Sequence, residues 1–124
     1  MSASIDEARL HAFIGKMLGD LGGAMAVPTV RIGLRLGLFE ALAQGPATAA
    51  ELAGRRDGLH ERYVREWALA QAANGYIDFD PATERFSISP EQAMVFVNSD
   101  SPVYLAGAFE LVAAMIEAEP KVEK

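Results

Sequence analysis

The stretch that decides the fold is GLHERYVREWALAQAANGYIDFD, residues 58–80. Apolar residues recur at helical spacing from His60 to Ala73, and Asn74-Gly75 is typical of a helix end. YIDFD then alternates apolar and polar residues, as does RFSIS after the turn PATE, so residues 76–89 are predicted to form a β-hairpin. The stretch therefore predicts a helix that leads directly into a hairpin.

Residues 4–24 are predicted to form the first helix. Ser4 followed by Glu7 is the pattern of a capping box. Beside a stripe of bulky apolar residues runs a stripe of small ones, namely Ala8, Ala12, Gly15, Gly19, Gly22 and Ala26. Each glycine inside a helix costs about 1 kcal/mol relative to alanine, so the small stripe predicts that another backbone approaches closely. The alternative is a helix that simply breaks at Gly22-Gly23.

Three more helices are predicted ahead of the hairpin. One begins at Pro28, a favourable first helical residue, and stops at Gly45-Pro46. A short one opens at Thr48, which forms a capping box with Glu51. The third is the helix over residues 60–73, with its predicted buried face formed by Tyr63, Val64, Trp67 and Ala70. Three helices followed by a two-stranded wing have the order of a winged helix-turn-helix domain.

The residues after the hairpin predict two further helices. PEQAMVFVN forms a short one, and Ser101-Pro102 supplies an N-cap and a first helical residue for the last one. From Val103 to Ile116 the only charged residue is Glu110. A helix that is apolar on all sides must be buried on all sides, and this one is too short to span a bilayer. It is expected to pack against a second copy or against the rest of a longer protein.

Length and composition predict one domain over residues 1–124. The predicted elements make it mainly α and divide it into a helical arm 4–27, a winged helix 28–90 and C-terminal helices 90–118. With 124 residues, of which 51% are hydrophobic, the chain can bury a core. It has no cysteine, which excludes disulfides and thiolate chemistry and fits a reducing cytoplasm. The acidic N-terminus does not resemble a signal peptide, so a cytoplasmic protein without a membrane segment is expected.

The charges argue against DNA binding. The net charge is −6, which repels a phosphate backbone. On the helix over 60–73, Glu61 and Arg65 stand four residues apart, as do Arg62 and Glu66, so the arginines are expected to be neutralised locally. The wing offers three acids, Asp78, Asp80 and Glu84, against the single base Arg85. Nucleic acid is therefore not expected as a partner, although a basic patch of Arg31, Arg35, Arg55 and Arg56 keeps a DNA-binding transcriptional regulator open as the alternative.

No catalytic or metal-binding pattern is found. The glycine cluster LGDLGGAM, residues 18–25, follows a helical pattern, whereas a cofactor loop needs a buried strand before it. His11 and His60 have no partner at metal or catalytic spacing and are expected to be surface or capping residues. Asp78, Asp80 and Glu84 lack the remaining ligands of a calcium loop and are interpreted as turn acids. A minority interpretation places an apolar pocket at Phe13, Met17, Met25, Phe109 and Met115.

Three segments resemble a known family. They are RIGLRLGLFEALAQGPATAAELAGR, LHERYVREWALAQAANGYIDFD and RFSISPEQAMVFV. Together they resemble the N-terminal winged-helix domain of actinobacterial-type S-adenosylmethionine-dependent class I methyltransferases, and more loosely the dimerisation domain of small-molecule O-methyltransferases. The resemblance covers residues 5–118, and LGLFEAL and ERYVREW are its most specific parts.

The resemblance implies a homodimer and a substrate pocket for a small-molecule methyl acceptor, partly roofed by this domain. Dimer contacts are then expected at Gly15, Gly19, Gly22, Leu105 and Val112. S-adenosylmethionine is expected in the full-length parent, held by a separate Rossmann-like catalytic domain that has no counterpart in this sequence. No catalytic or cofactor residue is carried over, and the chain is interpreted as an inactive N-terminal fragment. A third possibility is an interaction module that docks through its apolar last helix.

Overall fold

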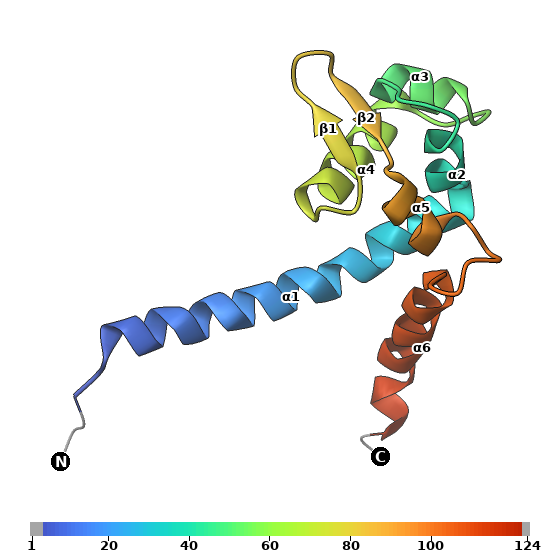
Figure 1. Cartoon of the computed structure of the whole chain (residues 1–124). Helices are drawn as coiled ribbons and strands as arrows, with labels where there is room; N and C mark the ends of the chain where they lie inside the picture. Colours follow the sequence, from blue (N-terminus) through green and yellow to red (C-terminus); the bar gives the residue numbers. More distant parts are fainter. Residues whose placement is uncertain (1–3, 123–124) are drawn as a thin grey trace.

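The computed structural model describes residues 4–122, so residues 1–3 and 123–124 of the expected domain lie outside the described part. Within it the elements are α1 (Glu7–Leu36), α2 (Leu38–Leu42), α3 (Ala49–Gly54), α4 (Glu61–Ala73), β1 (Asp78–Asp80), β2 (Arg85–Ser87), α5 (Pro90–Phe96) and α6 (Ala106–Val122). Helices α2 to α5 and the hairpin form a compact head at the C-terminal end of α1 (Figure 1). From this head α1 projects as a long arm, and α6 leaves in a different direction. The mainly helical winged-helix fold is confirmed.

Helix α1 is one continuous helix where two were predicted. It begins after the N-cap Asp6, whose side chain accepts a hydrogen bond from the backbone N–H of Arg9, so the predicted capping box of Ser4 and Glu7 is wrong. The helix also passes through Gly22-Gly23 and through Pro28 without a break. A proline removes one helical hydrogen bond, but this turn is fixed by packing, since the flanking residues Ala26, Val27 and Val30 are buried.

The end of α1 is set by Gly37. Its φ of 69° is left-handed, a conformation that glycine adopts without a Cβ penalty, and its N–H donates to the carbonyl oxygens of Gly33 and Leu34. The chain then turns directly into α2, so the predicted helix from Pro28 to Gly45 is two helices meeting at a sharp corner. In α2, Leu38, Phe39, Ala41 and Leu42 are buried, which places this short helix in the centre of the head.

The head packs α2, α3, α4 and α5 around aromatic side chains. The ring of Phe39 stacks on Phe96 at a centroid distance of 4.5 Å and meets the edge of Trp67 at 5.0 Å. The predicted capping box of Thr48 and Glu51 is confirmed at the start of α3, and His60 caps α4 by accepting a hydrogen bond from the N–H of Arg62.

The buried face of α4 differs in part from the prediction. Val64 and Trp67 are buried as expected, and they are joined by Ala68 and Gln71. Tyr63, which was predicted to be buried, is 71% exposed, and Ala70 is only half-buried. The face that contacts the other helices is therefore rotated toward Ala68 and Gln71, because α1 and α3 cover the helix from that side.

The predicted hairpin is present. Strands β1 and β2 pair in antiparallel register with Phe79 opposite Phe86, and Phe86 also exchanges two backbone hydrogen bonds with Ala47 ahead of α3. Phe86 is buried, while Phe79 lies on the more exposed side. Strand β2 is thus held by β1 on one side and by Ala47 on the other.

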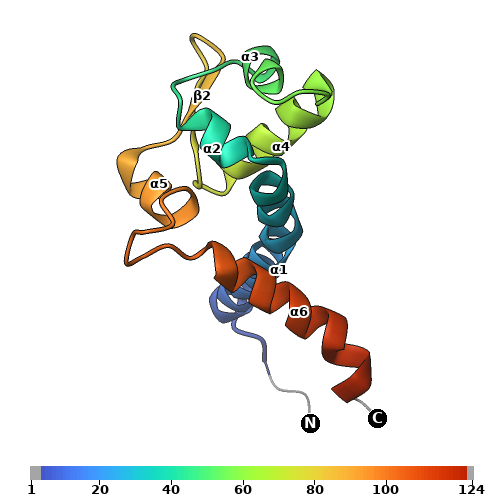
Figure 2. The same ribbon diagram turned by 90° about the vertical axis from the view of Figure 1, so that its right-hand side faces the viewer.

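The two C-terminal helices differ in how well they were predicted. Helix α5 begins at Pro90 with a capping box formed by Ser89 and Gln92. Helix α6 begins at Ala106, so the predicted start at Ser101-Pro102 is wrong; the Ser101 hydroxyl instead accepts the N–H of Val103 in a local turn. In the turned view α6 runs beside the last part of α1 (Figure 2). Ala106 and Ala113 are buried, but most of its large apolar side chains are exposed within one chain.

Candidate functional site

The N-terminal part of α1 is an exposed arm with a stripe of apolar side chains. We define the arm as residues 7–25, all of which are exposed. Its large apolar side chains are Leu10, Phe13, Ile14, Met17, Leu18, Leu21 and Met25. A contiguous exposed apolar surface of this kind is typical of a site where another molecule packs.

The residues expected at a dimer contact lie on free surfaces. A Cβ built on Gly15, Gly19 or Gly22 would have no heavy atom within 4 Å, so nothing in the described chain requires glycine there. Leu105 and Val112, at the start and middle of the α6 region, are exposed. All five positions are therefore accessible to a second molecule.

The residues expected to line a pocket are spread over three places. Phe13, Met17 and Met25 lie exposed on the arm, and Met115 lies exposed on α6. Phe109 instead packs beside Phe96, at a centroid distance of 5.9 Å, and lines an open apolar groove of about 350 Å³ at the junction of α5 and α6. Within one chain, only Phe109 of these five belongs to that groove.

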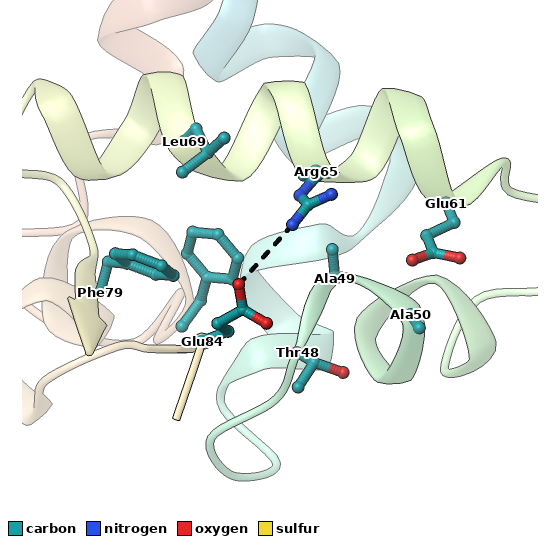
Figure 3. Close-up of a pocket in the computed structure, with 9 residues that line it drawn as sticks. Thr48, Ala49, Ala50, Glu61, Arg65, Leu69, Phe79 and Glu84 are labelled. Carbon is teal, nitrogen blue, oxygen red and sulfur yellow. Dashed lines mark ion pairs between the residues drawn. The ribbon is translucent and has the colours of Figure 1, made fainter. Parts of the chain in front are cut away.

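An exposed ion pair links α4, the expected recognition helix, to the hairpin. Arg65 of α4 reaches across to Glu84 of the hairpin, with Nη2 of the arginine 3.9 Å from Oε1 of the glutamate (Figure 3). Both side chains line a small cavity of about 140 Å³, whose walls also include Thr48, Leu69 and Phe79. Arg65 was expected to pair with Glu61, so its partner is a different acid, but Arg62 pairs with Glu66 at 3.5 Å as predicted.

Each charged side chain of the wing is either an acid or a base that is paired with an acid. Asp80 accepts hydrogen bonds from the N–H of Ala82 and the hydroxyl of Thr83, which confirms it as a turn acid. Arg85 pairs with Glu51 at 3.2 Å. The hydrogen bond from the Thr48 N–H, aided by Arg85, holds the pKa of Glu51 below its ordinary value. The wing therefore presents no uncommitted cation among the described residues.

The four arginines of the basic patch expected from the sequence make different contacts in the structure. Arg31 and Arg35 both contact the carboxylate of Glu110 on α6, at 3.0 and 3.6 Å. Arg55 donates to the carbonyl oxygens of Ala41, Gly45 and Pro46, which fixes the turn between α2 and α3. Of the four arginines, only Arg56 has a side chain that makes no ion pair or hydrogen bond with another described residue. Arg35, Arg55 and Arg56 line one groove, and Arg31 does not belong to it.

A groove that the sequence did not reveal lies between the end of α1 and the start of α4. It measures about 330 Å³ and is lined by apolar and aromatic residues, among them Ile32, Leu36, Leu59, Tyr63 and Trp67. We call it the Trp67 groove. Ile32 and Leu36 continue the helical spacing of the bulky stripe on the arm, and this is the signal in the sequence that could have located it.

The residues present do not fit S-adenosylmethionine or a metal. The glycine cluster 18–25 lies in the middle of α1, where the backbone amides are committed to the helix, so it cannot wrap a ligand. Among residues 4–122, no group of three or more His, Asp or Glu side chains could hold a metal ion. Within the same part of the chain, no helix combines the length and hydropathy needed to cross a membrane.

Comparison with known proteins identifies the fold. The sequence model of the Rv2258c-like winged HTH domain matches residues 23–98, more than half of the chain. The structure described as PigF with SAH has a TM-score of 0.65 and 22% identity, over 80% of this chain and 28% of that chain. The mitomycin 7-O-methyltransferase MmcR has a TM-score of 0.68 and 25% identity, over 82% of this chain and 31% of that chain. The chain thus spans less than a third of either protein. No curated protein sequence matches it.

Proposed function

Because the chain belongs to the Rv2258c-like winged HTH domain family, we propose that it is the dimerising, pocket-forming winged-helix domain of an S-adenosylmethionine-dependent small-molecule methyltransferase of the cytoplasm. The likeness to the mitomycin 7-O-methyltransferase MmcR supports this assignment. The methyl donor and the reacting atoms would belong to the rest of the parent protein. This domain contributes association and the exclusion of water from the substrate.

The observation that carries the proposal is the exposed arm. In this helix of 30 residues the first two thirds are exposed, so they gain little stabilisation from packing within the chain. Pairing with the arm of a second copy would bury the bulky stripe, and the small stripe of Gly15, Gly19 and Gly22 would allow a backbone to come close. A symmetric pair of this kind uses the same surface on both subunits, so it closes on itself as a dimer.

Light scattering tests the dimer. The chain should have the mass of a dimer at micromolar concentration, and Leu21→Glu, which places a charge in the bulky stripe, should produce a monomer. Lys16→Glu is the matched control, because it puts the same carboxylate on a position of the arm that is already charged and exposed. A monomeric wild-type chain, or a dimer unaffected by Leu21→Glu, would contradict the arm as the interface.

The glycines of the small stripe give a second test, in which helicity and dimer affinity should change in opposite directions. Replacing Gly15, Gly19 and Gly22 together by alanine should raise the helicity of the arm, because glycine is the poorer helix former. If a second backbone lies against these residues, the same replacement weakens the dimer. Circular dichroism and light scattering on the one variant measure both effects, and higher helicity with unchanged dimer affinity would remove the stripe from the interface.

A transcriptional regulator is the competing function, and two binding experiments separate it from the proposal. S-adenosylmethionine should leave the Tm of the chain unchanged, because a ligand stabilises only a state that binds it. No mobility shift of DNA is expected even at low salt. A salt-sensitive shift that is lost in Arg62→Gln and Arg65→Gln would favour the regulator instead.

A further inference from the structure

A second, basic groove borders the Trp67 groove. The basic groove also measures about 330 Å³ and is lined by Arg35, Leu36, Arg55, Arg56, Asp57 and Leu59. Leu36 and Leu59 line both grooves, so the two lie next to each other; together we call them the channel, with an apolar end and a charged end. The channel is formed by the last turns of α1, the loop after α3 and the first turns of α4, and it lies apart from the arm.

The apolar end has the size and character of a small-molecule site. Its volume of about 330 Å³ lies within the range of about 300–1,000 Å³ that is typical of ligand pockets. The indole of Trp67 forms part of the wall, while its N–H is already engaged with the carbonyl oxygen of Thr29 at 2.8 Å. The polar groups at its rim, His60 and Tyr63, are exposed. The wall itself therefore favours a ligand whose main part is a hydrocarbon chain or an aromatic ring.

The charged end contains one guanidinium that is not used by the fold. Arg55 is committed to three backbone carbonyls, and Arg35 is 3.6 Å from Glu110. Arg56 lies against the backbone of Gly37, where a Cβ would come within 2.9 Å of its Cζ, and makes no ion pair with the described residues. The acid in this groove is Asp57. Three guanidinium groups against one carboxylate favour an anion.

From this arrangement we propose that the channel binds an amphipathic organic acid, with the apolar body in the Trp67 groove and the carboxylate at Arg56. This site is independent of the methyltransferase proposal, because none of its residues belongs to the arm or to the α5–α6 groove. The guanidinium supplies a planar pair of donors, which is the geometry that a carboxylate accepts best.

Fluorescence gives a direct test, because Trp67 is the only tryptophan of the chain. Decanoate, added below its micelle-forming concentration, should change the Trp67 emission with saturation. Arg56→Gln should weaken this binding roughly tenfold or more, as expected for the loss of a charge-assisted hydrogen bond. Arg56→Lys keeps the charge and should restore part of the affinity. Decanol, which has the same body without the charge, should bind more weakly and should not respond to Arg56→Gln.

Arg9→Gln is the matched control, since Arg9 is an exposed arginine on the arm. It should bind decanoate as the wild type does, and the Tm of each variant verifies that the head remains folded. The proposal is overturned if decanoate gives no saturable change, or if Arg56→Gln and Arg9→Gln weaken binding equally. It is also overturned if the Trp67 emission follows protein concentration and not decanoate, because the groove would then be filled by a second copy.

Discussion

The indole of Trp67 lies against the backbone of Gly33 so closely that a Cβ on Gly33 would be 2.3 Å from Cζ2 of the indole. Phe39 closes the same space from another side, with Cε2 at 2.8 Å from the same point. The contact joins α1 to α4 and also fixes the wall of the Trp67 groove. Glycine is required at this position because the rigid indole ring occupies the space that a Cβ would need.

Gly33→Ala should therefore destabilise the head, although alanine is the better helix former. Two rigid aromatic rings cannot move aside together, and overpacking of this kind costs about 1–3 kcal/mol. Chemical denaturation followed by Trp67 fluorescence measures the loss. Gly54→Ala is the control, since a Cβ on Gly54 meets no atom within 4 Å, and it should cause no loss of stability.

Gln71→Met should stabilise the chain. Gln71 is 0% exposed, and neither its Nε2 nor its Oε1 has a hydrogen-bond partner among the described residues. A buried polar group without a partner costs about 1–3 kcal/mol, which an apolar side chain of similar volume recovers. The midpoint of urea unfolding should rise. A midpoint that falls would show that the amide of Gln71 is satisfied in solution.

The capping box of α3 should make the stability sensitive to acid. The pKa of Glu51 is lowered on folding, chiefly by the hydrogen bond from the Thr48 N–H, from an ordinary value of 4.5. The contribution of its carboxylate is therefore fully present above the unfolded pKa and is lost as the pH falls through the folded pKa. Glu51→Gln keeps the capping geometry without the charge. The difference in unfolding free energy between wild type and Glu51→Gln should shrink as the pH is lowered from about 6 to about 3.

Glu110 should hold α6 to α1 by a modest, salt-sensitive interaction. The Arg31 and Glu110 side chains are 21% and 44% exposed, so their coupling, measured by a double-mutant cycle with Arg31→Gln and Glu110→Gln, should be below about 1 kcal/mol. It should decrease in high salt. The pair of Lys16 and Asp20, which is more exposed, should give a smaller value. A coupling that is unchanged in high salt would contradict an electrostatic origin.

Local signals in the sequence predicted most elements of the head, but not the corner at Gly37 that separates α1 from α2. The capping box at Thr48, the end of α4 at Asn74-Gly75 and the alternation on both sides of PATE are short-range patterns, and each produced the expected element. The continuity of α1 could not be predicted in this way. Gly22-Gly23 and Pro28 are local signals for a helix end. The signal at Pro28 is overridden because Ala26, Val27 and Val30 are buried against the rest of the chain, whereas no contact in the described chain accounts for the continuity at Gly22-Gly23.

The candidate sites were less accessible to such reasoning, because they depend on contacts between distant residues. Arg65 meets Glu84 and not its neighbour in α4, and Arg31 meets Glu110 on another helix. The Trp67 groove arises where Leu36, Leu59 and Tyr63 come together around one indole. The helical stripe of the arm was visible in the sequence, but the channel at its end depended on the corner at Gly37.

The continuity of α1 across Pro28 has a geometric consequence. Because the helix breaks neither at Gly22-Gly23 nor at Pro28, the arm and Gly33 belong to one element. The direction in which the arm leaves the head is therefore set by the same contact, between Gly33 and Trp67, that forms the wall of the Trp67 groove.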